Sequence, residues 1–158
     1  MFGDVIMSKK HLCLIIGPAK YPEDDARMVA LFLAEPGEKF ICGASTANMV
    51  ARYLPAGQKL SDVPGLAMVT DGTLILSEVL DILASNSRPN LPEKQYDAHR
   101  LAVALLEADS VSFLIGMAVN KSQRSLSLPA KPIVKSRFVR ELADMLKQKG
   151  KQVMAEYF

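Results

Sequence analysis

This sequence of 158 residues has little net charge, no long apolar run and no evident cluster of metal-binding residues. The formal net charge is only +2, which is too small to predict a nucleic acid or an anionic membrane as partner. No apolar run approaches the roughly 18 residues of a membrane helix. The first ten residues, MFGDVIMSKK, lack the apolar segment of a signal peptide. We therefore expect a cytoplasmic protein that binds neither nucleic acid nor membrane.

Cysteine and histidine are also rare, with two of each. Cys13 and Cys42 lie in separate apolar runs, and a lone pair in a cytosolic protein forms neither a disulfide framework nor a CxxC site, so we predict buried free thiols. His11 and His99 have no neighbours at zinc-ligand spacing. The nucleophile elbow pattern is absent as well, and no complete set of catalytic residues is evident. Any metal or cofactor therefore stays unknown at this point.

The composition that remains is that of one soluble globular domain spanning residues 1–158. Apolar residues make up 49% of the chain and charged residues 23%, and this length can bury a real core. Short, nearly continuous apolar runs predict strands that are covered on both faces. The predicted strands are 12–16, 39–42, 66–69, 111–115 and 152–158.

Amphipathic patterns alternate with these strands. An acid-rich first turn behind Pro22 predicts a helix start, and Gly150 stands where a helix C-cap is needed. The predicted helices are 22–33, 46–54, 73–84, 96–108 and 136–149. Alternating strands and helices predict an α/β fold, a three-layer sandwich in which a mostly parallel sheet of about five strands has helices on both faces.

The turn after the second strand, GAST at residues 43–46, is the first candidate ligand site. Parallel sheets bind ligands at the carboxyl ends of their strands. Gly43 and Ala44 leave the main chain uncovered, and Ser45 or Thr46 is expected to cap the next helix. The free N–H groups of the first helical turn would then hold a small anion, with Asn48 adding an amide. The alternative is an ordinary strand-to-helix turn, which uses the same residue types.

Three further turns are expected at the same edge. Asp71 could bind a sugar hydroxyl or Mg²⁺, or it could only form an Asx turn or cap. Adjacent Asp24 and Asp25 point about 100° apart on a helix, so we expect them to stabilise the helix dipole rather than to form an acid/base pair. The remaining candidate ligand-binding residues of these turns are Gly72, Thr73, Gly17, Gly116 and Asn120.

The same stretches carry a resemblance to a known family. Their sequences are GPAKYPEDD (17–25), EKFICGASTANMVARYL (38–54), GLAMVTDGTLILSEVLDIL (65–83), VSFLIGMAVN (111–120) and FVRELADMLKQKGKQVMAEYF (138–158). In this order they resemble the C-terminal region that follows the catalytic domain in bacterial SpoIIE-family serine/threonine protein phosphatases. The sequence departs from the family pattern at Ala44, where the family has glycine, at Asp71, where it has glutamate, and at Ala19, where it often has proline.

The resemblance implies an accessory domain rather than the metal-dependent catalytic domain of that family. We expect a regulatory α/β domain that binds a small anionic, phosphate-containing ligand and acts with a phosphatase catalytic domain. One alternative is a free-standing phosphoryl or sugar-phosphate enzyme that uses Asp71. Another is a structural module that self-associates through the strand 152–158, because an edge strand can pair with a second copy.

Overall fold

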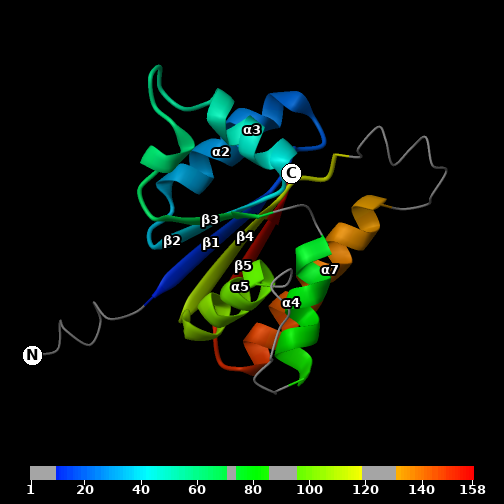
Figure 1. Ribbon diagram of the computed structural model, residues 1–158. Coiled ribbons are helices and arrows are strands. Elements are labelled where there is room, and N and C mark those ends of the chain that lie inside the picture. The colour runs from blue at the N-terminus through cyan, green and yellow to red at the C-terminus, as the bar shows by residue number, and fades with distance from the viewer. Residues whose placement is uncertain (1–9, 71–73, 86–95, 119–130) are drawn as a thin grey trace, which may run out of the picture.

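The computed structural model describes residues 10–70, 74–85, 96–118 and 131–158 (Figure 1). The strands are β1 (His11–Ile16), β2 (Glu38–Cys42), β3 (Leu66–Thr70), β4 (Ser110–Ile115) and β5 (Gln152–Tyr157). The helices are α2 (Asp25–Ala34), α3 (Ala44–Arg52), α4 (Leu74–Ser85), α5 (Tyr96–Glu107) and α7 (Lys131–Gln148), with short 3₁₀ turns η1 (Pro22–Asp24) and η2 (Leu60–Asp62). Each predicted strand is present within one or two residues of its expected bounds.

The strands form one sheet in the order β3-β2-β1-β4-β5, and every pair of neighbours is parallel. The predicted α/β class is therefore confirmed. The chain builds the sheet outward from β1 in one direction through β2 and β3, and then returns to the other side of β1 to add β4 and β5. As predicted, the segment near the C-terminal end of the chain forms an edge strand.

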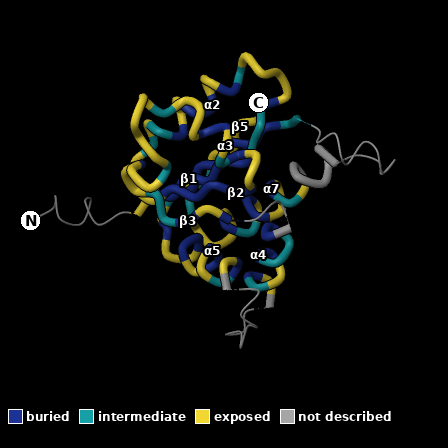
Figure 2. The backbone as a smooth tube through the Cα atoms, turned by 45° about the horizontal axis from the view of Figure 1, so that its top comes forward, coloured by how far each residue is buried: buried dark blue, intermediate teal, exposed yellow. Residues whose placement is uncertain are grey.

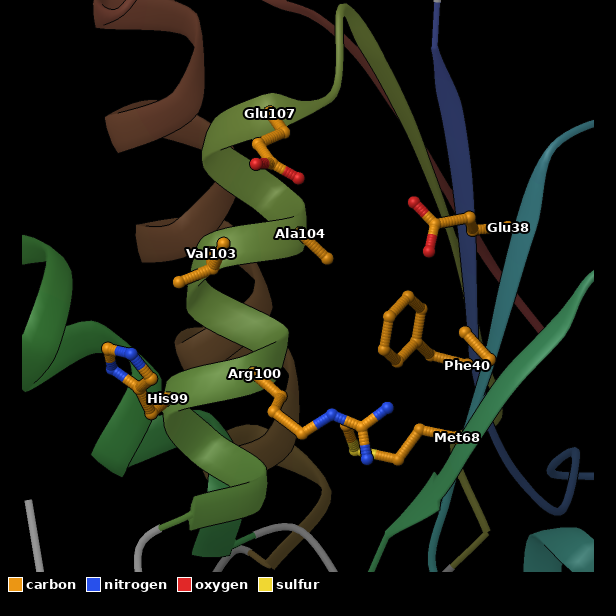
Figure 3. Close-up of a pocket in the computed structure, with 9 residues that line it drawn as sticks. Glu38, Phe40, Met68, His99, Arg100, Val103, Ala104 and Glu107 are labelled. Atoms are coloured by element: carbon orange, nitrogen blue, oxygen red, sulfur yellow. The ribbon is translucent and has the colours of Figure 1, made fainter.

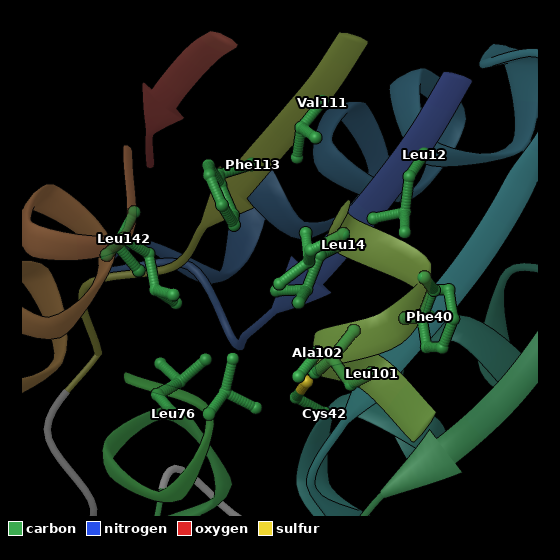
Figure 4. Packing of buried hydrophobic residues seen from close by; sticks show 14 of the residues in the cluster. Leu12, Leu14, Phe40, Cys42, Leu76, Leu101, Ala102, Val111, Phe113 and Leu142 are labelled. Carbon is green, nitrogen blue, oxygen red and sulfur yellow. The ribbon is translucent and has the colours of Figure 1, made fainter. Parts of the chain in front are cut away.

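Helices cover both faces of the sheet, which completes the three layers (Figure 1). Successive residues of β1 point to opposite faces. Leu12 and Leu14 pack with α4, α5 and α7 in the larger core cluster (Figure 4), while Cys13 and Ile15 pack with α2 and α3 in the smaller one. The central strands are buried and the turns beyond α3 are exposed (Figure 2). These two clusters explain why the strands read as continuous apolar runs.

Helix boundaries differ from the predicted ones for local reasons. Helix α3 begins at Ala44, two residues earlier than expected, and α7 begins at Lys131, five residues earlier than expected. Pro132 lies in the first turn of α7, where proline is well tolerated. Gly150 follows α7 with φ 87°, in the left-handed conformation predicted for a C-cap glycine. Among the described helices, none combines the length and the apolar character needed to cross a bilayer.

Candidate functional site

The carboxyl ends of the strands form the edge at which the predicted ligand site lies. Strand order reverses between β1 and β4, and open parallel sheets bind ligands in the crevice beside such a reversal. Gly17, Gly43 and Gly116 directly follow β1, β2 and β4. The fold thus brings three of the predicted site residues to one edge of the sheet.

Gly43 is the N-cap residue of α3, and its backbone conformation explains why a glycine stands there. Its φ is 98°, which is costly for a residue with a Cβ atom. The Gly43 N–H donates to the carbonyl of Thr70 over 2.8 Å and so joins this turn to the end of β3. No side chain caps α3. The prediction that Ser45 or Thr46 caps this helix is therefore wrong.

The first turn of α3 nevertheless presents main-chain donors to solvent. Ala44 and Ser45 are exposed, and so is Asn48 one turn further along. Within the described part of the chain, the amides of Ala44, Ser45 and Thr46 donate to no carbonyl, as is usual for the first N–H groups of a helix. These donors and the positive end of the helix dipole favour a negatively charged group.

Thr46 has a buried hydroxyl that links two turns of this edge. Only 1% of the residue is exposed, and its Oγ1 accepts a hydrogen bond from the Gly17 N–H over 2.9 Å. The same oxygen lies 3.2 Å from the Gly17 carbonyl, to which it donates its proton. Because α3 begins at Ala44, Thr46 is its third residue rather than its N-cap, which is the physical reason for the failed prediction.

Close main-chain packing fills the crevice at the reversal of strand order. A Cβ atom on Gly116 would lie 2.1 Å from the carbonyl oxygen of Pro18, so the turns after β1 and β4 touch each other. The carbonyl of Phe158 accepts hydrogen bonds from the N–H groups of Lys20, over 3.0 Å, and Met117, over 2.8 Å. In the described residues, the open donors of this edge thus lie at α3 rather than between β1 and β4.

The two adjacent aspartates of the first helical region have separate structural partners. Asp25 is 6% exposed and accepts a hydrogen bond from the Ala19 N–H over 2.9 Å. Asp24 is half-buried, with a carboxylate oxygen 4.0 Å from a guanidinium nitrogen of Arg27. The expectation that the two carboxylates form no acid/base pair agrees with this geometry. Asp25, however, fixes the preceding turn in addition to lying in the first turn of α2.

Four predicted site residues, Asp71, Gly72, Thr73 and Asn120, lie outside the described residues, and their roles stay predictions. In the part of the chain that the structure describes, no three His, Cys, Asp or Glu side chains gather closely enough to hold a metal ion. The Mg²⁺ alternative therefore depends on Asp71, about which the structure says nothing.

Both cysteines are buried free thiols, as predicted. Burial is the main cause that raises the pKa of Cys13 to about 12, and the nearby Glu35 carboxylate adds to the effect while Lys39 opposes it. Burial also raises the pKa of Cys42 to about 11, although a hydrogen bond with Thr70 lowers it. Because the thiolate is the nucleophilic form, neither side chain is suited to covalent chemistry.

A polar cluster at the opposite edge of the sheet was not anticipated. His11 Nδ1 lies 2.7 Å from Ser110 Oγ, and His11 Nε2 lies 2.9 Å from a carboxylate oxygen of Glu35 and 3.3 Å from Ser112 Oγ. Burial alone would raise the pKa of Glu35. Hydrogen bonds from Ser112 and His11, together with the charges of His11 and Lys39, outweigh burial and leave this pKa below its ordinary value.

The cluster has the composition of a serine–histidine–carboxylate set, but the described main-chain amides beside Ser110 all have partners. An acyl-transfer site needs main-chain donors beside the nucleophile. Near Ser110, the amides of Lys10, Asp109 and Ser110 all donate within the protein, to the Asp109 carboxylate or to the Lys10 carbonyl. We interpret the cluster as structural. It joins β1 and β4, which pair at His11 and Ser110, to the end of α2.

Comparison of the chain with protein-family models, with curated proteins and with solved structures finds no match of any of the three kinds. The resemblance to the C-terminal region of SpoIIE-family phosphatases is therefore untested by them.

Proposed function

We propose that the domain is regulatory and non-catalytic, and that it binds a small phosphate-containing anion at the N-terminus of α3. The observation that carries the proposal is the uncapped first turn of this helix, where Ala44 and Ser45 are exposed and three amides donate to no carbonyl of the described residues. Main-chain amides at a helix N-terminus hold phosphate well, because several donors converge and the helix dipole adds a positive potential.

Two contacts support the idea that this turn is held in a fixed position. The Gly43 N–H is bonded to the end of β3, and the hydroxyl of Thr46 is bonded to the turn after β1. A binding turn that is already fixed loses little conformational entropy when the ligand arrives. The second half of the proposal, that the domain acts with a phosphatase catalytic domain, rests on the resemblance to the SpoIIE-family C-terminal region.

The test is a titration of the full chain with inorganic phosphate, a sugar phosphate and a nucleotide, followed by thermal unfolding and by amide chemical shifts. A ligand at ten times its dissociation constant stabilises the folded state by about 1.4 kcal/mol, which raises the melting temperature by about 3–6 °C in a domain of this size. The amides of Ala44 to Thr46 are expected to shift most.

The variant that tests the site most directly is Ala44→Pro. Ala44 is the first helical residue of α3, a position where proline is well tolerated and where its effect is to remove one N–H donor. We expect weaker phosphate binding with unchanged stability of the free protein. Ser45→Ala, which keeps the amide, serves as the matched control. Equal phosphate affinity in Ala44→Pro and wild type, or no shift with any of the three anions at about 10 mM, would contradict the proposal.

A second candidate function is self-association through the edge strand β5. The Gln152 N–H donates to the carbonyl of Asp109, just before β4, over 3.1 Å, and the Phe158 N–H donates to the carbonyl of Ile115 over 2.7 Å. By strand periodicity, the N–H groups of Val153, Ala155 and Tyr157 therefore point away from the sheet. Met154 and Tyr157 are 61% and 46% exposed. An uncovered edge with apolar side chains can pair with a second copy of the chain.

Light scattering at two protein concentrations tests this candidate. If β5 pairs with itself, Ala155→Pro should produce monomers, because it removes an outward N–H while leaving the bonds to β4 in place. Val153→Thr, which keeps every main-chain donor, is the control. A wild-type chain that is monomeric at both concentrations would remove this candidate without affecting the anion proposal.

A further inference from the structure

The two edges of the sheet differ in how well they are suited to pair with a further strand. The register of β3 on β2 shifts between Lys39 and Phe40, so Ala67 is an extra residue of β3. Such a bulge twists an edge strand away from regular pairing. Figure 3 shows Phe40 and Met68 beside α5, where they line a pocket of about 360 Å³. The β3 edge is therefore a poor template for another strand.

The β5 edge, in contrast, is regular. Its six residues, Gln152–Tyr157, pair with β4 without a shift in register. All of them except Val153 are exposed. Their sequence, QVMAEY, contains neither proline nor lysine, which are residues that often protect edge strands from pairing. Glu156 is its one charged residue. This edge therefore offers a straight row of main-chain groups to a partner strand.

Apolar surface lies directly beside this edge. Met154 pairs with Ser112, and Ser112 pairs with Cys13, which packs with α2 and α3. Paired residues of neighbouring strands point to the same face of a sheet, so Met154 points to the α2 side. Met154 is 61% exposed, and Leu31 of α2 is 37% exposed. Both residues line a small hollow of about 40 Å³ between α2 and the strands β4 and β5.

The side chains of β5 complement those of a second β5 in one register. Two copies related by a twofold axis perpendicular to the sheet pair antiparallel, with the residue at the axis opposite its own counterpart. If that residue is Met154, Gln152 lies opposite Glu156 of the second copy. If it is Glu156, two carboxylates lie opposite each other, which is destabilising. Among registers centred on a residue of β5, the one at Met154 alone places a side-chain hydrogen-bond donor opposite Glu156.

The open main-chain groups fit the same register. With Met154 at the axis, Val153 of one copy lies opposite Ala155 of the other. The N–H groups of both residues point away from β4, so the two residues can exchange both of their main-chain hydrogen bonds. The central pair of methionines is then a non-hydrogen-bonded pair, in which opposite side chains lie closest together. Main-chain and side-chain requirements are thus met together.

We propose that β5 pairs antiparallel with β5 of a second copy of this chain, with the twofold axis at Met154, so that the two sheets become one. This pairing rests on the candidate self-association through β5 and adds its symmetry, its register and the residues that meet. The two methionines cover each other at the centre, where their flexible side chains fill irregular gaps well. The exposed Leu31 of each α2 lies on the same face of the joined sheet.

Disulfide cross-linking of the full chain tests the register. In a non-hydrogen-bonded antiparallel pair, opposite Cα atoms are about 4.5 Å apart, a distance that a disulfide can span. We expect Met154→Cys to form a covalent dimer in oxidised glutathione, with at least about tenfold more product than either control. One control is Ala155→Cys, because Ala155 and its counterpart lie diagonally, about 7–8 Å apart. The other is Ser45→Cys on α3, an exposed residue that reports random collisions. The native cysteines are buried and give no background.

A charge change and its reversal test the same register without new cysteines. Gln152→Glu places like charges opposite each other twice in the dimer, so its dissociation constant should rise by about fivefold. Adding Glu156→Gln to this variant should restore the wild-type value. Gln148→Glu, at an exposed position of α7, is the matched control and should leave the dissociation constant unchanged. All three side chains are exposed, so the variants are expected to fold, which circular dichroism checks. Sedimentation over a range of concentrations measures the dissociation constants.

The outcomes separate the register from self-association itself. A wild-type chain that is monomeric up to about 1 mM would exclude self-association and, with it, the proposed pairing. A wild-type dimer in which Met154→Cys cross-links no better than the controls would keep self-association and refute the register. The same holds if Glu156→Gln fails to restore the affinity of Gln152→Glu. Neither result bears on phosphate binding at α3, because α3 follows β2 and β5 lies at the far edge of the sheet.

Discussion

Replacing Thr46 with valine removes a hydroxyl that joins α3 to the turn after β1 while keeping a branched side chain of nearly the same shape. Thr46 is buried on the face of α3 that packs against the sheet. Its hydroxyl accepts from the Gly17 N–H and donates to the Gly17 carbonyl. In the variant, both main-chain groups lose their partner, and the valine methyl prevents water from replacing the hydroxyl at the same point.

The expected loss of stability follows from these two contacts. An intramolecular hydrogen bond contributes about 1 kcal/mol, and leaving a buried donor without an acceptor costs about 1–3 kcal/mol. Gly17 is only half-buried, so the lower end of that range applies, and we expect the free energy of unfolding to fall by about 2 kcal/mol. For a domain of this size, the melting temperature should fall by about 4–8 °C.

Urea and thermal denaturation, followed by circular dichroism, measure this effect. Thr46→Ser keeps the hydroxyl and should lose clearly less stability than Thr46→Val. The adjacent Ser45→Ala removes an exposed hydroxyl and should change the free energy of unfolding by less than about 0.5 kcal/mol. If Thr46→Val and Ser45→Ala are equally stable, the link between the two turns contributes nothing, and the idea that the α3 turn is held in place fails with it.

Three other predictions concern packing and titration. Gly116→Ala should destabilise the fold by about 1–3 kcal/mol or more, because its Cβ would meet main-chain atoms. It should lower stability more than Gly57→Ala, where the surroundings are open and only the φ of +83° opposes a side chain. Equal melting temperatures of the two variants would contradict this prediction. The pKa of Glu35 lies below its ordinary value of 4.5. The stability that this carboxylate contributes is therefore present above about pH 4.5 and is lost on acidification. The difference in unfolding free energy between wild type and Glu35→Gln should accordingly become smaller from about pH 6 to about pH 3. Both cysteines should resist a thiol-specific disulfide reagent at about pH 8 in the native protein and react fully in denaturant; rapid native labelling would show that the thiols are not buried.

Local patterns in the sequence were sufficient for the order and type of the secondary structure elements. Runs such as 12–16 and 111–115 are apolar at every position, which indicates strands with helices on both faces. Alternation of these runs with amphipathic segments specifies parallel pairing, because a helix must cross back between the strands. The C-cap role of Gly150 was likewise predictable, because a left-handed conformation favours glycine. The positive φ of Gly43, in contrast, was not predicted.

The direction of individual side chains was less accessible. Thr46 belongs to the buried stripe of α3 together with Met49 and Val50, at the spacing i, i+3 and i+4. That spacing could have indicated a buried hydroxyl rather than a cap, but threonine is common in both places. The outcome depended on Gly17, which lies 29 residues earlier and supplies both hydrogen-bonding partners.

What the sequence by itself determined is thus the α/β class, the order of the elements and the glycines at their turns, because these depend on periodicity and backbone preference within a few residues. What only the tertiary structure decided is which distant side chains meet. The contact between His11 and Ser110 joins residues 99 positions apart, and the hydrogen bonds between Thr46 and Gly17 join residues 29 positions apart. Strand order and register are settled by the packing of the whole chain, so no local stretch of sequence specifies them.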